Sequence, residues 1–433
     1  MGSSNYQLEP GGNCNGSVNI PGDKSISHRA VMLASIADGV SEITGFLPST
    51  DCEATLSAFQ CMGVKVERIT PSHIRIHGVG NLGLAPPDSE LNMGNSGTAM
   101  RLLSGILCGQ KFSTKLIGDE SLTKRPMQRI QTPLLKMGAK IALSTDGTPP
   151  IIIDSPKSLR GINYPLPMAS AQVKSCVLLA GLYADSKTCV QETSCSRDHT
   201  ERMLQSFSYP VEIEKGQICL EGGGKLKASS INIPGDISSA AFFIVGALIS
   251  QSSKLVIENV GINPTRDGVI EILRLMGASI NIINTRQSGF EPVADLVINN
   301  STLNGIDIPK RLIARSIDEF PIIFIAAACA KGTTTLSGAE ELRVKESDRI
   351  HNMVVGLQQI GINAQEQKDG LTIVGGKITG GEVDSAGDHR IAMAFAISAL
   401  VSEKPITISK TENVDTSFPN FVSCAKQVGL RFR

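Results

Sequence analysis

The segment that decides the fold, Lys24–Ala37, reads KSISHRAVMLASIA. Its charged and hydroxyl-bearing residues fall mostly in the first turn and a half, and no charge follows before Asp38. An apolar helix that carries no charge over several turns must be buried on nearly all sides. Only its N-terminal end can then meet solvent. The segment therefore predicts a buried helix that presents a polar N-terminus.

The same design recurs along the chain. A polar cluster opens an apolar helix in five further segments, Gly97–Leu107, Gln172–Ala184, Asp236–Ile249, Asp318–Ala330 and Asp388–Val401. The starts fall about 65 to 85 residues apart, and recurrence at a regular spacing indicates repeated structural units. We therefore expect six copies of one unit, each built around a buried helix.

A second helix in each unit is predicted to end in a glycine turn. Four apolar segments lead into such a glycine: Leu56–Met62 into Gly63, Leu134–Met137 into Gly138, Ile272–Met276 into Gly277, and Leu357–Ile360 into Gly361. Glycine just past a helix end favours the left-handed conformation, and a β-rich stretch follows here. The third unit is degenerate, with Phe207-Ser208-Tyr209-Pro210 in place of the glycine turn.

Two Pro-Gly-Asp turns divide the chain into halves. One is Pro21-Gly22-Asp23 and the other is Pro234-Gly235-Asp236, and each precedes a buried helix. A chain of 433 residues is also too long for one ordinary core. We expect two similar α/β domains of three units each, one spanning residues 21–234 and the other residues 1–20 plus 235–433.

The helix N-termini are predicted to bind anions. Three helices packed side by side in a domain would present their unpaired N–H groups and positive dipole ends on one face. Lys24, Arg29, Arg101 and Arg390 lie near such ends, where a cation is unfavourable unless an anion is expected. The alternative is that the polar residues are only helix caps, which suits the Asp and Ser members but not the basic ones. Two such faces turned towards each other would form a cleft for phosphate and carboxylate groups.

Charge and composition exclude several classes of partner. Lys plus Arg equal Asp plus Glu at 41 each, so no overall field favours nucleic acid or an anionic membrane. The ten cysteines are scattered without a C-x-x-C pair, which predicts buried free thiols in a reducing cytosol. We expect no signal peptide and no membrane span, hence a soluble cytoplasmic protein, and we expect it to be a monomer.

Five motifs in order along the chain resemble those of one enzyme family. They are PGDKSISHR at Pro21–Arg29, GNSGTAMR at Gly94–Arg101, LTKRPM at Leu122–Met127, ELRVKESDR at Glu341–Arg349 and GDHRIAM at Gly387–Met393. Together they resemble the 5-enolpyruvylshikimate-3-phosphate synthases, from about residue 18 to 430. SAQVK at Ser170–Lys174, RDHTE at Arg197–Glu201 and TSFP at Thr416–Pro419 resemble the branch called class II.

This resemblance implies a fold and a reaction. The family fold is two domains, each of three β-α-β-α-β-β repeats in an inside-out α/β barrel, with the active site in the cleft between them. The reaction transfers the enolpyruvyl group of phosphoenolpyruvate to the 5-hydroxyl of shikimate 3-phosphate. It passes through a tetrahedral intermediate and releases phosphate. Domain closure on binding is expected, because the implied site residues come from both halves.

The resemblance also implies the binding residues. Shikimate 3-phosphate is expected to bind mainly the first domain, through Lys24, Ser25, Arg29, Ser170, the Ala171 backbone, Gln172 and Arg197, with Asp318 and Lys345 from the other domain. Phosphoenolpyruvate is expected to contact Lys24, Gly97, Arg125, Gln172, Arg349 and Arg390. A side chain at Gly97 would crowd a ligand lying against the backbone. Gly97 is also the residue of a glyphosate-sensitive site, whereas the class II features lead us to expect lower sensitivity than in class I.

The reaction needs two proton carriers. Asp318 or Lys24 is the candidate for the hydroxyl proton and Glu346 for the carbon proton, and the sequence does not assign the roles among these three. The charge-dense Lys345–Arg349 could also be a solvated helix start held by local ion pairs. No metal or other cofactor is expected, because Arg and Lys can neutralise the anions. His28, His199 and His389 are expected to be structural, and His73, His77 and His351 to be surface or strand residues.

Three other functions are less consistent with the residues. UDP-N-acetylglucosamine enolpyruvyl transferases usually carry a cysteine in a mobile Gly/Pro-rich loop, whereas Cys108 here ends an apolar helix. A non-catalytic anion-binding module predicts the loss of Lys24, Asp318 or Glu346, and all three are present. RNA phosphate cyclases share some of the repeat architecture, but none of their motifs occurs here and the charge balance argues against RNA.

Overall fold

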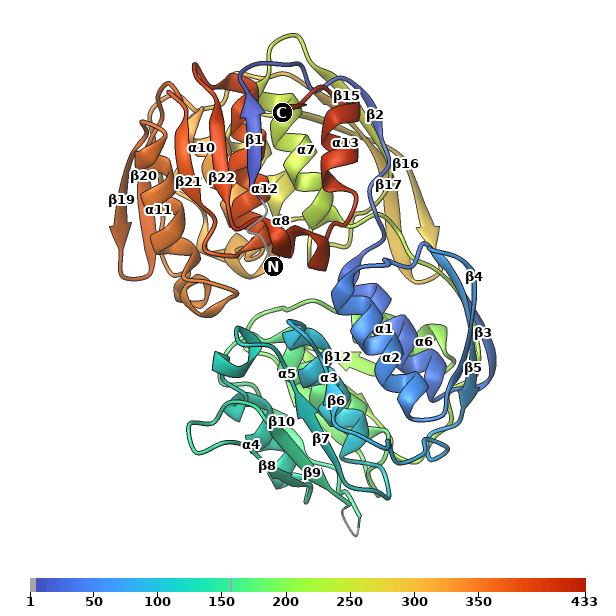
Figure 1. The fold of residues 1–433 in the computed structure, drawn as a ribbon. Coiled ribbons are helices and arrows are strands. Elements are labelled where there is room, and N and C mark those ends of the chain that lie inside the picture. The colour runs from blue at the N-terminus through green and yellow to red at the C-terminus, as the bar shows by residue number, and fades with distance from the viewer. Residues whose placement is uncertain (1–4, 156–157) are drawn as a thin grey trace. The chain divides into compact units, whose positions relative to one another are not determined.

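The computed structural model describes residues 5–155 and 158–433, so residues 1–4 of the predicted N-terminal tail lie outside the described part. The chain divides into two compact units, each with its own hydrophobic core. The N-terminal unit comprises Gly22–Ile233 and Ser288–Glu291. The C-terminal unit comprises Met1–Pro21, Pro234–Gln287 and Pro292–Arg433. Most elements of both units are labelled in Figure 1.

Three buried helices form the centre of the N-terminal unit: α1 (Lys24–Ser35), α3 (Gly97–Leu107) and α5 (Ala171–Gly181). They coincide with the first three charge-poor segments, and α3 has the predicted bounds. Each begins at a side chain that caps it, namely Asp23, Ser96 and Ser170. The helices α3 and α5 pack very closely, because a Cβ at Gly105 would lie 2.3 Å from the Cys176 carbonyl oxygen. The second helices are α2 (Thr50–Cys61), α4 (Gln128–Lys136) and α6 (His199–Ser206).

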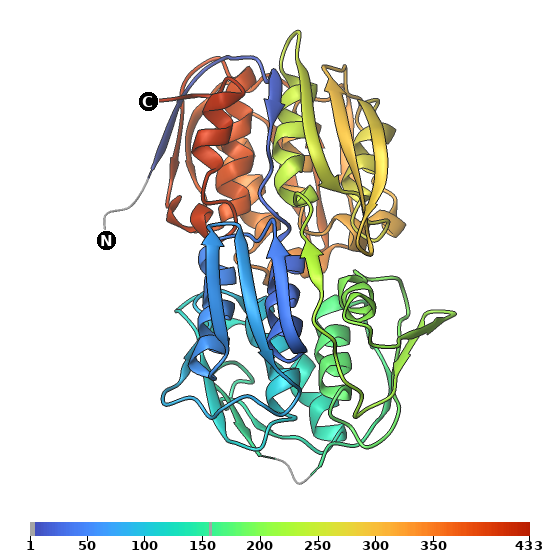
Figure 2. The same ribbon diagram turned by 90° about the vertical axis from the view of Figure 1, so that its right-hand side faces the viewer.

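The three sheets of the N-terminal unit share one pairing pattern. In each, a parallel pair of strands is extended by two antiparallel strands. Their orders are β14-β3-β5-β4, β6-β7-β9-β8 and β10-β11-β13-β12. The strands are β3 (Asp38–Thr44), β4 (Lys65–Thr70), β5 (His73–Val79), β6 (Leu91–Asn92), β7 (Thr114–Ile117), β8 (Lys140–Ala142), β9 (Ile151–Asp154), β10 (Asn163–Pro165), β11 (Thr188–Gln191), β12 (Glu212–Glu214), β13 (Gln217–Leu220) and β14 (Ser230–Asn232). In Figure 2 the blue strands of the first sheet cover the outer side of the blue helices.

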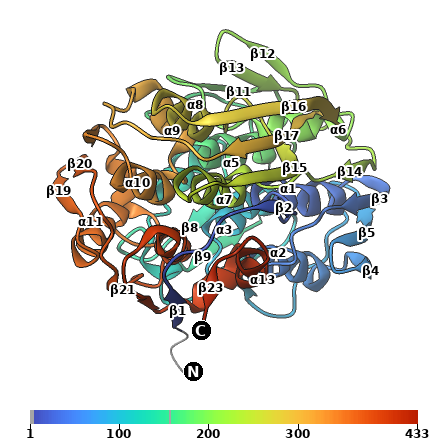
Figure 3. The same ribbon diagram turned by 90° about the horizontal axis from the view of Figure 1, so that it is seen from above.

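The C-terminal unit is built in the same way around α7 (Ile237–Ile249), α10 (Phe320–Ala328) and α12 (His389–Ser398). These three helices pack against one another. Figure 3 shows α7 and α10 lying between the strands β15–β17 on one side and β19–β20 on another. The other helices are α8 (Gly268–Leu275), α9 (Ile313–Ser316), α11 (Arg349–Gln359) and α13 (Phe421–Gln427).

The predicted start of the fifth buried helix is wrong. The helix α10 begins at Phe320, and Asp318 lies in the turn between α9 and α10. Pro321 stands in the first turn of α10, where its missing N–H costs no hydrogen bond. The last predicted segment ends in a 3₁₀ turn, Ala399–Val401, rather than in continued α-helix.

Two of the three sheets in the C-terminal unit repeat the pattern of one parallel and two antiparallel neighbours. Their orders are β16-β17-β15-β2 and β21-β22-β1-β23, and the third, β18-β20-β19, has isolated bridges in place of its parallel strand. The strands are β1 (Tyr6–Glu9), β2 (Gly16–Val18), β15 (Lys254–Gly261), β16 (Ser279–Ser288), β17 (Glu291–Asn299), β18 (Thr333–Leu336), β19 (Asn363–Gln367), β20 (Gly370–Val374), β21 (Gly381–Asp384), β22 (Ile406–Ser409) and β23 (Arg431–Phe432). The short 3₁₀ segments include Leu122–Lys124, Lys310–Leu312, Glu340–Val344 and Glu412–Thr416.

The glycine turns are confirmed by the backbone. Gly63, Gly138, Gly277 and Gly361 have φ of 88°, 90°, 100° and 87°. In the degenerate third unit Ser208 takes the same place with φ 60°, although it has a side chain. The left-handed turn is therefore kept where the glycine is lost.

The prediction that all cysteines are buried free thiols is wrong. Cys189 and Cys219 lie directly opposite each other on the antiparallel strands β11 and β13 and are joined by a disulfide. Cys61 and Cys195 are exposed. Sequence spacing could not reveal the pair, because its two members are brought together only by the strand register. Among the described residues, no helix is both long and apolar enough to cross a membrane.

Candidate functional site

The N-terminal ends of α1, α3 and α5 meet through buried arginines. Arg29, in the second turn of α1, donates from Nε to Thr200 Oγ1 at 2.7 Å and from Nη2 to Ser175 Oγ at 2.9 Å. Arg101 of α3 donates from Nη1 to Gln172 Oε1 of α5 at 2.8 Å. The predicted gathering of positive helix ends therefore exists within this unit.

Lys24 and Ser25 open α1. The Lys24 ammonium lies 2.6 Å from Asp51 Oδ2 of α2, and 20% of the lysine side chain remains exposed. The Ser25 carbonyl oxygen accepts a hydrogen bond from Arg29 Nη1 at 2.9 Å. An anion that reaches Lys24 would therefore compete with, or join, a carboxylate that is already present.

Gly97 leaves room for two guanidinium groups. A Cβ at this first residue of α3 would lie 2.9 Å from Arg101 Nη1 and 3.4 Å from Arg125 Nη1. Arg125 is held by Asn95 Oδ1 at 2.7 Å and by Ser121 Oγ at 3.1 Å. Glycine thus lets two cations approach the positive end of α3, which is an arrangement suited to an anion.

The segment Ser170–Gln172 starts α5. The Ser170 hydroxyl caps the helix by accepting from the Val173 N–H at 3.4 Å. Ala171 is the first helical residue, so its N–H has no intrahelical acceptor. Gln172 donates from Nε2 to Thr98 Oγ1 at 3.1 Å. Arg197 lies half-buried in the loop between β11 and α6.

The C-terminal unit places Arg349 among three carboxylates. Its Nε lies 2.8 Å from Asp388 Oδ2, its Nη2 lies 2.6 Å from Glu346 Oε2, and its Nη1 lies 3.6 Å from Asp318 Oδ1. Burial alone would lower the pKa of Arg349, but these carboxylates outweigh it and raise that pKa above its usual value. The guanidinium is therefore a permanent, rigidly held positive charge.

Asp318 connects the other predicted residues of this unit. Its carboxylate lies 3.5 Å from Lys345 Nζ, and its carbonyl oxygen accepts from Arg390 Nη1 at 3.0 Å. Lys345 also pairs with Glu341 at 2.8 Å. The structure thus brings together Asp318, Lys345, Arg349 and Arg390, with Glu346 attached through Arg349.

Three acidic partners of these cations were not among the residues expected at the site. Asp388 caps α12 by accepting from the Arg390 N–H at 2.9 Å, and it also binds Arg349. Asp51 binds Lys24, and the buried Glu319 lies 3.9 Å from Arg390 Nη1. An Asp at a helix start is ordinarily read as a cap, so the sequence carried no signal for its second role.

The histidines have local hydrogen-bond partners. His28 contacts Thr55 Oγ1 at 2.7 Å, and His389 contacts Ser417 Oγ at 3.0 Å. His199 contacts Glu291 Oε1 at 2.7 Å. The other three are His73 and His77 on β5, and His351 on the exposed side of α11. These positions agree with structural roles.

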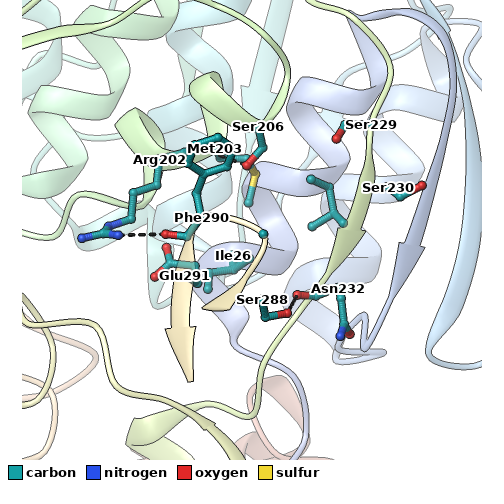
Figure 4. Close-up of a pocket in the computed structure, with 12 residues that line it drawn as sticks. Ile26, Arg202, Met203, Ser206, Ser229, Ser230, Asn232, Ser288, Phe290 and Glu291 are labelled. Carbon is teal, nitrogen blue, oxygen red and sulfur yellow. Dashed lines mark hydrogen bonds between the residues drawn. The ribbon is translucent and has the colours of Figure 1, made fainter. Parts of the chain in front are cut away.

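A pocket of about 90 Å³ lies elsewhere in the N-terminal unit. Its apolar lining includes Ile26, Met203 and Phe290, and Arg202 Nη1 donates across it to the Phe290 carbonyl oxygen at 2.8 Å (Figure 4). None of its lining residues is a predicted site residue. The candidate site therefore lies at the helix N-termini and not in this cavity.

Comparison with known proteins identifies close relatives. The family model described as EPSP synthase (3-phosphoshikimate 1-carboxyvinyltransferase) matches residues 8–424. The 3-phosphoshikimate 1-carboxyvinyltransferase of Methylococcus capsulatus is 58% identical over 98% of this chain and 97% of its own length. The enzyme of that name from Legionella pneumophila is 56% identical over 98% of both chains.

Solved structures give the same result. An EPSP synthase from Acinetobacter baumannii matches with a TM-score of 0.90 and 51% identity, covering 100% of this chain and 99% of that one. A second structure of EPSP synthase from the same organism matches with a TM-score of 0.89 and 50% identity. The likeness extends over the whole length in both sequence and fold.

Proposed function

The chain belongs to the EPSP synthase family, and we propose that the two groups of helix N-termini described above bind the substrates of the family's reaction. The protein transfers the enolpyruvyl group of phosphoenolpyruvate to the 5-hydroxyl of shikimate 3-phosphate and releases phosphate. It is a transferase of the shikimate pathway, which supplies chorismate and the aromatic amino acids. The observation that carries the proposal is the placement of basic side chains at helix N-termini in both units.

Shikimate 3-phosphate is assigned mainly to the N-terminal unit. Its residues are Lys24, Ser25, Arg29, Ser170, Ala171, Gln172 and Arg197, and Asp318 and Lys345 are added from the C-terminal unit. Arg29 supports this assignment because three hydrogen bonds fix its guanidinium among α1, α5 and α6. A fixed guanidinium is well suited to a phosphate group.

Phosphoenolpyruvate is assigned to Lys24, Gly97, Arg125, Gln172, Arg349 and Arg390. Its phosphate and carboxylate together need several cations. Gly97 lets Arg101 and Arg125 approach the N-terminal end of α3, and two cations at that end would attract one anionic group. Arg349 and Arg390 supply further positive charge, and Asp318 and Glu346 compensate part of it in the free protein.

The proton transfers are assigned to three residues. Asp318 or Lys24 takes the proton of the 5-hydroxyl as its oxygen attacks the substituted carbon of phosphoenolpyruvate. Glu346 donates a proton to the methylene carbon, giving a tetrahedral ketal phosphate. The phosphate then leaves as a proton is removed from the new methyl group. The contact of 2.6 Å between Glu346 and Arg349 supports this assignment only by fixing the position of the carboxyl group.

The finer architecture and setting belong to the same proposal. We assign each unit three β-α-β-α-β-β repeats in an inside-out α/β barrel, supported by the recurring strand pattern in its sheets. We divide the chain into a shikimate 3-phosphate domain at 21–234 and a second domain, 1–20 plus 235–433. Both domains act on one pair of substrates. We also propose a cytoplasmic location, a monomeric state and no nucleic-acid partner, supported by the balanced charge.

Phosphate release from phosphoenolpyruvate tests the proposal. Shikimate 3-phosphate and UDP-N-acetylglucosamine are offered separately, without added metal. We expect release with shikimate 3-phosphate alone, reduced at least about 100-fold in Glu346→Gln through loss of a proton carrier. The exposed Glu340 provides the matched control, and Glu340→Gln should keep the wild-type rate. Release with the nucleotide sugar alone would contradict shikimate 3-phosphate as the acceptor. Full activity of Glu346→Gln would contradict the role of Glu346 as a proton carrier.

A further inference from the structure

Lys174 is a buried lysine that the proposed reaction does not use. It lies in the first turn of α5, two residues after Gln172, and is 0% exposed. Its ammonium lies 2.7 Å from Glu201 Oε1 of α6 and 3.1 Å from Glu192 Oε1, which precedes α6. Both carboxylates are also buried, with 2% and 6% of their side chains exposed. The cluster therefore joins α5 to α6 and to the loop that precedes α6.

The ammonium is expected to stay charged. Burial would lower the pKa of Lys174, but Glu201 and Glu192 outweigh it and raise that pKa above its ordinary value. A charge held in this way keeps its partners in place, because removing one partner leaves another buried and uncompensated. The geometry of the cluster is thus more rigid than that of an exposed ion pair.

Lys174 and Glu192 together close the loop that carries Arg197. Glu192 Oε1 accepts from the Ser196 N–H at 3.2 Å and from the Ser196 hydroxyl, while Lys174 Nζ donates to the Ser196 carbonyl oxygen at 3.4 Å. Both polar groups of the Ser196 backbone are therefore fixed by this pair. Arg197 is the next residue, so the contacts of Lys174 and Glu192 with Ser196 also position the backbone at Arg197.

The adjacent residues fix Arg29. Ser175 follows Lys174 on α5, and Thr200 precedes Glu201 on α6. The Thr200 hydroxyl donates to Ser175 Oγ at 2.7 Å, and both oxygens accept from the Arg29 guanidinium. The contact between α5 and α6 thus contains the Lys174–Glu201 ion pair and, beside it, the hydrogen-bonded Ser175 and Thr200, which orient Arg29.

We propose that Lys174 and Glu192 are positioning residues that hold Arg197, and through α6 also Arg29, in the geometry that binds shikimate 3-phosphate. The inference rests on the proposed assignment of these two arginines to that substrate. Neither Lys174 nor Glu192 need touch the substrate. Their effect is specific to its binding, whereas a purely structural ion pair would affect stability alone.

Glu192→Gln tests the loop contact, because it leaves the Lys174–Glu201 pair in place. Calorimetric binding of shikimate 3-phosphate, without phosphoenolpyruvate, should show a Kd about tenfold higher. At saturating substrates kcat should stay within about twofold, and the KM for phosphoenolpyruvate should not change. Glu212→Gln is the matched control, since Glu212 forms an exposed pair with Lys187 on the same sheet at 2.6 Å. It should leave the Kd unchanged.

A double-mutant cycle shows whether the effect passes through Arg197. In an Arg197→Met background, Glu192→Gln should weaken shikimate 3-phosphate binding no further. An equal loss in both backgrounds, or an unchanged Kd in Glu192→Gln itself, would overturn the inference alone. Unchanged binding in Arg197→Met would overturn the substrate assignment and the inference with it. Lys174→Met should raise the Kd at least as much, and if it fails to fold, Glu192→Gln still decides.

Discussion

Two buried cations, Arg349 and Lys174, are matched by carboxylates. Arg349 is surrounded by Asp388, Glu346 and Asp318, and Lys174 by Glu201 and Glu192. Such groups are costly to bury, so their partners are as essential as the cations themselves. The motifs identified most of the cations from the sequence. Of the partners, Asp318 and Glu346 were also expected at the site, whereas the sequence did not indicate that Asp388, Glu192 and Glu201 pair with these cations.

His28 provides a test of burial through pH. It is fully buried beside Thr55, and burial, with Lys24 and Arg29 nearby, holds the pKa of His28 well below its usual value. In the unfolded chain it would titrate near its ordinary pKa of about 6.5. Below that pH the unfolded chain gains a proton that the folded protein does not. Stability is therefore lost as the pH falls, by about 1.4 kcal/mol per pH unit for this one group.

The comparison is between wild type and His28→Gln, which keeps hydrogen-bonding groups but does not titrate. The free energy of unfolding is measured by urea denaturation at about pH 7.5 and about pH 5.5. Between these two pH values it should fall by about 1.4 kcal/mol more in wild type than in the variant. An equal loss in the two proteins would mean that folding does not lower the pKa of His28.

At the scale of elements, repeated helices were the most predictable feature. The segment Gly97–Leu107 is a helix with the predicted bounds, because Ser96 caps it and its apolar run has no interruption. Asp318 was wrongly placed in a helix, because a cap-like residue before an apolar run can also lie in a preceding turn. The Cys189–Cys219 pair depends on the register of β11 and β13, which no local pattern specifies.

Ser208 offers a test of the repeated turn. It has φ 60° at the end of α6, where the other units have glycine, and its side chain is exposed. A left-handed conformation costs a non-glycine residue about 1–2 kcal/mol, partly offset by the greater freedom of glycine in the unfolded chain. Ser208→Gly should therefore raise the free energy of unfolding by about 0.5–1 kcal/mol, measured by urea denaturation.

Gly138 provides the reciprocal control. It has φ 90° after α4, and a Cβ there would meet nothing closer than the Ser158 carbonyl oxygen at 3.5 Å. With the same offset from the unfolded chain, Gly138→Ala should lower the free energy of unfolding by about 0.5–1 kcal/mol. If Ser208→Gly lowers the free energy of unfolding, or Gly138→Ala leaves it unchanged, the left-handed backbone conformation does not determine these stability changes.

In the whole molecule the charges balance, but the positive charges are concentrated locally. The protein has as many acidic as basic residues, yet each unit gathers its cations at the starts of its buried helices. The sequence predicted this gathering from the recurring pattern, whereas the pairing of strands into six small sheets needed the structure. We propose that the helix ends of both units act on the same substrates.

The KM for phosphoenolpyruvate in two matched variants tests that claim most directly. Arg125→Met changes the N-terminal unit and Arg390→Met the C-terminal unit, while Arg286→Met, at an exposed arginine paired with Asp295, is the control. Steady-state phosphate release should show the KM raised about tenfold or more in each of the first two and unchanged in the control. A wild-type KM in either Arg125→Met or Arg390→Met would contradict the claim that both units bind phosphoenolpyruvate.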